Sequence, residues 1–66
     1  MFTVKDGELY EPLTLQGSFD SLDKAVEFAY SLESFLGVWG ELVQLNETTY
    51  VIYNTNEVDY IKIERV

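Results

Sequence analysis

Carboxylates dominate the chemically reactive side chains of this sequence. The 66 residues include 12 Asp and Glu against four Lys and Arg, which gives a formal net charge of −8 at pH 7. His and Cys are both absent from these residues. A disulfide scaffold, a Cys or His metal site and a nucleophile activated by imidazole are therefore excluded. Acid–base chemistry would have to come from Asp, Glu, Lys, Tyr, Ser or Thr.

Two pairs of carboxylates have spacings that could serve catalysis, but each has a simpler structural role. Asp20 and Asp23 lie where a helix is expected to begin, and acids are favoured at that end of a helix. Glu57 and Asp59 are one strand repeat apart, which is typical of an exposed strand. Acid–base catalysis needs a pocket that separates two pKa values, and so short a chain has little volume for one. We therefore expect that the protein is not an enzyme.

Metal and cofactor sites are not indicated either. Calcium takes six to eight oxygen ligands, and the acids in residues 20–23 and 54–57 are too sparse to supply them. Gly37 and Gly40 are too few for a phosphate-binding loop, and no helix signal follows them. The sequence predicts neither a metal nor a cofactor.

The excess of acids has two explanations. A net charge far from zero keeps small proteins soluble. Alternatively, carboxylates such as Glu27, Glu57 and Asp59 could face the Lys and Arg side chains of a nucleic-acid-binding protein, as a DNA mimic does. Direct binding to nucleic acid is disfavoured, because phosphate contacts require cations and the chain has only four.

Aromatic side chains are the second candidate for a binding surface. One Trp, five Tyr and four Phe exceed what a single small core can enclose, and Tyr and Trp are enriched at interfaces. Trp39, between Gly37 and Gly40, could be a lid on the core or an anchor in a partner's pocket. Tyr53 and Tyr60 are further candidates for a partner-binding surface.

The N-terminal third of the chain predicts two strands. Residues 1–5 alternate in polarity, and Asp6-Gly7 suits a two-residue type I′ turn that would pair Lys5 with Glu8 across a hairpin. Pro12 lacks an amide hydrogen, so the second strand is expected to lie at an edge of the sheet or to break at this residue.

Residues 20–36 predict an amphipathic helix. Asp20 is expected to cap it, and Gly37 is expected to end it in the left-handed conformation. The apolar arc spans roughly 220°, wider than a helix on one sheet requires. The Trp39 loop, a curved sheet or a second molecule could cover the surplus.

The remainder predicts strands at residues 41–45, 49–54 and 58–66, with a bulge between Tyr60 and Ile61. The fold class is therefore α+β: a small antiparallel sheet with one helix packed across a face, in the order ββαβββ. Residues 1–66 are expected to form a single domain.

The sequence predicts neither a signal peptide nor a membrane span. Residues 1–5 do not resemble a signal peptide, and no apolar run approaches the roughly 18 residues of a membrane span. We therefore expect a cytoplasmic protein that does not contact membranes, and we interpret Asn46-Glu47-Thr48 as a turn rather than a glycosylation site.

One segment of the chain resembles a known group of proteins. Residues 17–32, GSFDSLDKAVEFAYSL, followed by a strand that opens Glu41-Leu42-Val43, resemble small uncharacterised accessory proteins of tailed bacteriophages over less than half of the chain. Some phage accessory proteins bind and inhibit a host protein, occasionally as acidic mimics of DNA. The resemblance implies such a role, in the host cytoplasm.

These observations lead to two hypotheses. The first is a non-enzymatic module that binds a protein with a basic surface and could inhibit it, through Trp39, Glu27, Glu57, Asp59, Tyr53 and Tyr60. The second is a structural homodimer in which the surplus apolar arc or an edge strand pairs with its symmetry mate.

Overall fold

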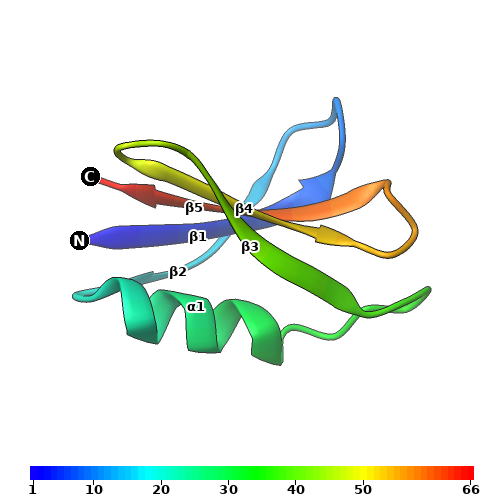
Figure 1. Ribbon diagram of the computed structural model, residues 1–66, viewed down its shortest axis with the longest axis horizontal. Helices are drawn as coiled ribbons and strands as arrows, with labels where there is room; N and C mark the ends of the chain where they lie inside the picture. The colour runs from blue at the N-terminus through cyan, green and yellow to red at the C-terminus, as the bar shows by residue number, and fades with distance from the viewer.

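The computed structural model describes residues 1–66 as five strands and one helix (Figure 1). The elements are β1 (Phe2–Glu8), β2 (Thr14–Phe19), α1 (Leu22–Ser31), β3 (Trp39–Asn46), β4 (Thr49–Asn54) and β5 (Asp59–Arg65). The strands form one antiparallel sheet in the order β2-β1-β5-β4-β3. The predicted α+β class and the order ββαβββ are confirmed.

The helix covers one face of the sheet and leaves the other face open (Figure 1). It packs against β1, β2 and β5. The core lies between these layers, where Ala25 and Ala29 of α1 meet the alternate apolar residues of β1, β4 and β5. The fully buried strand residues of this core are Val4, Ile52, Ile61 and Ile63.

Both termini lie at one end of the sheet (Figure 1). The β1–β2 loop, the β4–β5 turn and the loop after α1 lie toward the opposite end. This arrangement follows from the antiparallel registers, because Glu8 pairs with Asp59 and Trp39 pairs with Asn54. Segments far apart in the sequence therefore meet at that end.

The predicted turn at Asp6-Gly7 is wrong. β1 continues through both residues, because Asp6 pairs with Ile61 and Gly7 pairs with Tyr60 on β5. The chain reverses in residues 9–13 instead, where Tyr10 takes a φ of 68° and Glu11 N–H donates to the Glu8 carbonyl at 3.1 Å. A ladder with β5, which local turn chemistry cannot reveal, determines where β1 ends.

The helix is shorter than predicted at both ends. Its N-cap is Ser21, whose Oγ accepts from Lys24 N–H at 3.3 Å, and not Asp20. It ends at Ser31 instead of Leu36, with no basic residue in its last turn. Continuing it would place Glu33 at the negative end of the helix dipole. Gly37 lies in the following loop and does not have a positive φ, so the predicted cap at this glycine is wrong.

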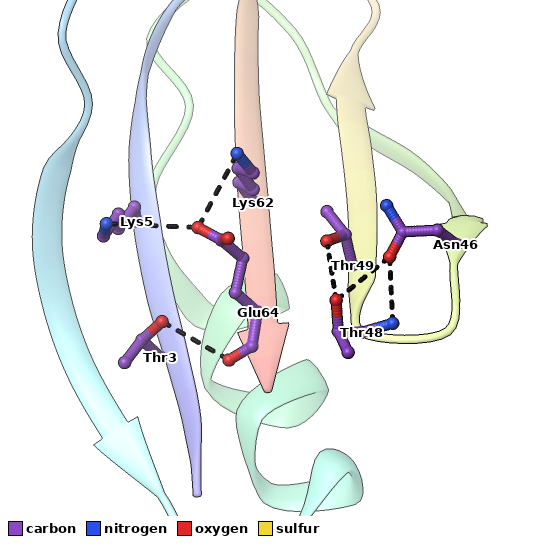
Figure 2. Close-up of polar contacts among 7 residues, drawn as sticks. All are labelled: Thr3, Lys5, Asn46, Thr48, Thr49, Lys62 and Glu64. Atoms are coloured by element: carbon purple, nitrogen blue, oxygen red, sulfur yellow. Dashed lines mark hydrogen bonds and ion pairs between the residues drawn. The ribbon is translucent and has the colours of Figure 1, made fainter. Parts of the chain in front are cut away.

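The last three strands lie where they were predicted, but β3 already begins at Trp39, which was predicted to lie in a loop, and the predicted bulge is wrong. β5 pairs with β4 and β1 without a register shift, so Tyr60 and Ile61 face opposite sides. Register shifts occur instead between β1 and β2 and between β3 and β4. Asn46 forms the predicted turn: its Oδ1 accepts from Thr48 N–H at 2.9 Å and Oγ1 at 3.0 Å (Figure 2). With ten residues, the helix falls short of the length needed to cross a membrane.

Candidate functional site

On the open face of the sheet, neighbouring side chains pack against one another. Tyr53 and Tyr60, both predicted site residues, are cross-strand partners whose rings stack with centroids 5.9 Å apart. Val51 lies on this face and is only 2% exposed, because its register partners Lys62 and Val43 flank it. The open face is therefore not a continuous apolar patch.

The same face holds a small charge network (Figure 2). The carboxylate of Glu64 lies 4.0 Å from Lys5 Nζ and 3.6 Å from Lys62 Nζ. At the helix N-terminus, Lys24 pairs with Asp20 at 3.0 Å, and this contact lowers the pKa of the Asp20 carboxyl below its usual value. Three of the four cations are thus paired, while the carboxylates other than Glu64 and Asp20 form no ion pair.

Unpaired carboxylates gather at the end of the molecule away from the termini, which we call the acidic end. The ends of β1 and β5 bring Glu8 and Asp59 directly opposite each other. The adjacent β1–β2 loop, β4–β5 turn and loop after α1 add further acids, and the loop and turn are joined by a 2.8 Å hydrogen bond from Leu9 N–H to the Val58 carbonyl. The carboxylates of the acidic end are Asp6, Glu8, Glu11, Glu33, Glu57 and Asp59.

The pairing of Glu8 with Asp59 should cost stability, because like charges directly opposite in a sheet repel. We expect Glu8→Lys to raise the free energy of unfolding by about 0.5–1 kcal/mol, measured by urea denaturation. Glu47→Lys is the matched control, since it makes the same charge change in the β3–β4 turn at the opposite end. An equal gain in both variants would assign the effect to net charge rather than to this pair.

The loop after α1 (residues 32–38, the α1–β3 loop) is held at several points. The Trp39 indole N–H donates to the Leu32 carbonyl at 2.7 Å. The buried Asn54 side chain donates to Ser34 Oγ. Thr55 N–H donates to the Val38 carbonyl at 3.0 Å, and Val38 N–H donates to Thr55 Oγ1 at 3.2 Å. The core and the β4–β5 turn therefore fix the course of this loop.

The tethered loop presents large apolar side chains to solvent. Phe35 is 98% exposed, and Leu36 and Val38 are also largely exposed. Tyr10, 95% exposed, and Val58 are also exposed at this end, on the β1–β2 loop and the β4–β5 turn. Rigid exposed aromatic residues are the usual anchors of protein interfaces. The acidic end thus combines unpaired negative charge with apolar side chains held away from the core.

Gly37 permits the close approach of the loop to the β4–β5 turn. A Cβ on Gly37 would lie 2.0 Å from Thr55 Oγ1 and 2.6 Å from Asn54 Oδ1. We expect Gly37→Ala to destabilise the protein by about 1–3 kcal/mol, because the Thr55 hydroxyl must move and Val38 N–H loses its acceptor. Thermal denaturation measures the loss. Gly40→Ala is the comparison, with a single neighbour, the Tyr53 carbonyl, at 3.1 Å; an equal loss there would contradict this account.

Backbone strain is found at the same end. Tyr10 and Glu57 are the two non-glycine residues with positive φ, at 68° and 60°. Left-handed conformations cost an ordinary side chain roughly 1–2 kcal/mol. Glu57 closes the β4–β5 turn, where Asn56 Oδ1 accepts from Asp59 N–H and Asn56 Nδ2 donates to Asp59 Oδ2 at 2.8 Å. Strained residues cluster at functional sites, so this observation also favours the acidic end.

A cavity of about 230 Å³ opens between the α1–β3 loop and the ends of β1 and β5. Asp6, Glu33 and Asp59 line it together with Phe35 and Trp39. No three acidic side chains approach closely enough to hold a metal ion. The arrangement can accept a positively charged group from a partner, because the walls are anionic and aromatic.

The predicted site residues do not form one surface. Glu57 and Asp59 belong to the acidic end, and Trp39 borders its cavity while packing partly buried against the core. Tyr53 and Tyr60 stack on the open face, and Glu27 is exposed on the helix. Phe35, which is 98% exposed, was not among the predicted partner-binding residues. The available signal was Glu33, a charged residue that would interrupt the apolar face of a helix continued to residue 36.

Comparison with known proteins gives no match: no protein-family model, no curated protein and no solved structure is similar to this chain.

Proposed function

We propose that this chain is a small non-enzymatic module that binds a protein with a basic surface through its acidic end. The observation that carries the proposal is the exposure of Phe35. This side chain is 98% exposed on a loop that hydrogen bonds hold in place, at the same end of the molecule as the unpaired carboxylates. Carboxylates steer a basic partner toward the site, and exposed apolar side chains then fill hydrophobic pockets on it. The preformed loop limits the entropy lost on binding.

The class of partner is proposed from charge. A basic surface on a bacterial nucleic-acid-binding protein would meet the acidic end as it meets phosphates, and the chain would inhibit it in the host cytoplasm as a phage-encoded DNA mimic. The resemblance of residues 17–32 to phage accessory proteins supports this part of the proposal. The long-range charge of −8 also supports fast association at low ionic strength.

The test begins with capture of partners from a bacterial lysate on the immobilised chain, with elution by rising salt. A captured basic protein is purified, and its binding to three chains is measured: wild type, Glu8→Gln/Glu11→Gln/Glu57→Gln, and the control Asp23→Asn/Glu27→Gln/Glu47→Gln. Both variants have the same net charge, but only the first changes the acidic end. We expect the first to lose affinity and the second to retain it.

Three results would contradict the proposal. Equal losses in both variants would indicate that net charge alone drives binding. A loss confined to the control variant would move the site to the helix surface around Glu27. An association rate that does not fall as salt rises would remove electrostatic steering altogether. Competition by duplex DNA for the purified partner tests the mimicry separately, because a true mimic and DNA cannot bind together.

A further inference from the structure

We infer that β2 is a dimerisation edge, at which a second copy of this chain adds its own β2 antiparallel to the first and extends the sheet to ten strands. β2 and β3 are the two edges of the sheet. Each edge presents backbone N–H and carbonyl groups that no strand of the same molecule satisfies. Such groups pair readily with another chain unless the edge is protected.

β2 lacks the charged residues that usually protect an edge strand, although it carries one bulge, where Gln16 has no partner between Leu15 and Gly17. Its six residues, TLQGSF, contain no charged side chain, although nearly a quarter of the chain is charged. Charged residues and Pro are the common devices that keep strand edges apart, and Pro12 lies in the preceding loop rather than in β2. Leu15 adds an apolar side chain, 56% exposed, beside this edge.

β3 is better protected, which singles out β2. β3 carries Glu41, and its register with β4 shifts twice, while β2 has one shift against β1. Bulges twist an edge away from a flat pairing partner. A second strand would therefore find a more regular and uncharged ladder on β2 than on β3.

A strand without charged residues can pair with its own copy, because no like charges then face each other across the interface. Two chains of charge −8 repel, so a stable dimer must keep their carboxylates apart. Antiparallel pairing about a two-fold axis places uncharged β2 against uncharged β2 and directs the two acidic ends to opposite ends of the extended sheet. Both sites remain open in this arrangement, so the dimer is compatible with partner binding but does not depend on it.

The test is sedimentation of the purified chain from about 10 μM to about 1 mM, with amide hydrogen exchange at the two extremes. We expect a dimer, with increased protection of β2 amides and unchanged protection of β3 amides at high concentration. Added salt should tighten the dimer, because it screens the repulsion between two acidic copies. This is the opposite of its effect on a basic partner, so the two proposals can fail independently.

Two variants locate the interface. Thr14→Lys/Ser18→Lys places charges on exposed positions of β2, and Val43→Lys/Leu45→Lys places the same charges on exposed positions of β3. We expect the β2 variant to raise the dimer dissociation constant about tenfold or more and the β3 variant to leave it unchanged. A monomer throughout the concentration range, protection of β3 in place of β2, or a dimer disrupted only by the β3 variant would overturn the inference.

Discussion

Replacement of Ile52 by alanine should lower the free energy of unfolding by about 2–5 kcal/mol. Ile52 is fully buried on β4 and packs in the core with Ile61 and Ile63. The substitution removes buried apolar surface and leaves a cavity that the surrounding β-ladders cannot close. A domain of 66 residues has a small stability margin, so one such loss is a large fraction of the total.

Urea denaturation followed by circular dichroism measures this effect. Val43→Ala is the matched control, because it shortens another β-branched side chain of the same sheet that is 45% exposed. We expect the control to change stability by less than about 1 kcal/mol. If the two variants unfolded at similar urea concentrations, the core would not be where the structure places it.

The strands could be predicted from the sequence because each has a local signal. β4 is apolar on both faces, which is typical of an interior strand, and it lies between β3 and β5. The end of β1 could not be predicted in the same way. Asp6-Gly7 is typical of a tight turn, but the pairing of Asp6 and Gly7 with β5 depends on residues more than 50 positions away. Non-local pairing overrides turn propensity here.

The predicted end of the helix was wrong for a related reason. Apolar periodicity continues through Phe35 and Leu36, so the pattern alone favoured a longer helix. The contacts that hold the α1–β3 loop come from Trp39, Asn54 and Thr55, which lie on other elements. Part of the predicted apolar arc therefore belongs to the loop. Its residues Phe35 and Leu36 are exposed at the acidic end and do not lie on the helix.

The sequence predicted which types of residue form the candidate site, but not how the fold brings them together. Acidic and aromatic residues were expected to bind a partner, and Glu57 and Asp59 do lie at the acidic end. The site as a whole draws carboxylates from β1, β5 and three connecting segments, so only the topology could assemble it. Like charges in register and two strained residues lie at this end, each with a stability cost that a binding role would explain, and the exposed Phe35 lies at the same end.

Removal of the Phe35 ring should have the largest effect on the proposed binding. We expect Phe35→Ala to weaken affinity for the captured basic partner about 30-fold or more, as truncation of an interface anchor does. The loss should lie mainly in the dissociation rate, because apolar contacts form after encounter. The stability of the chain should be unchanged, since this side chain is 98% exposed and contributes little to the core.

Kinetic measurement separates this effect from that of charge. Glu11→Gln should slow association and leave dissociation nearly unchanged, because an exposed carboxylate acts mainly by steering. Leu45→Ala is the control for Phe35→Ala: this apolar side chain is also exposed, but it lies at the opposite end of the sheet. If Leu45→Ala weakened binding as much as Phe35→Ala, the partner would occupy a different surface. If neither did, the exposed ring would have no part in binding, and the acidic end would act through charge alone.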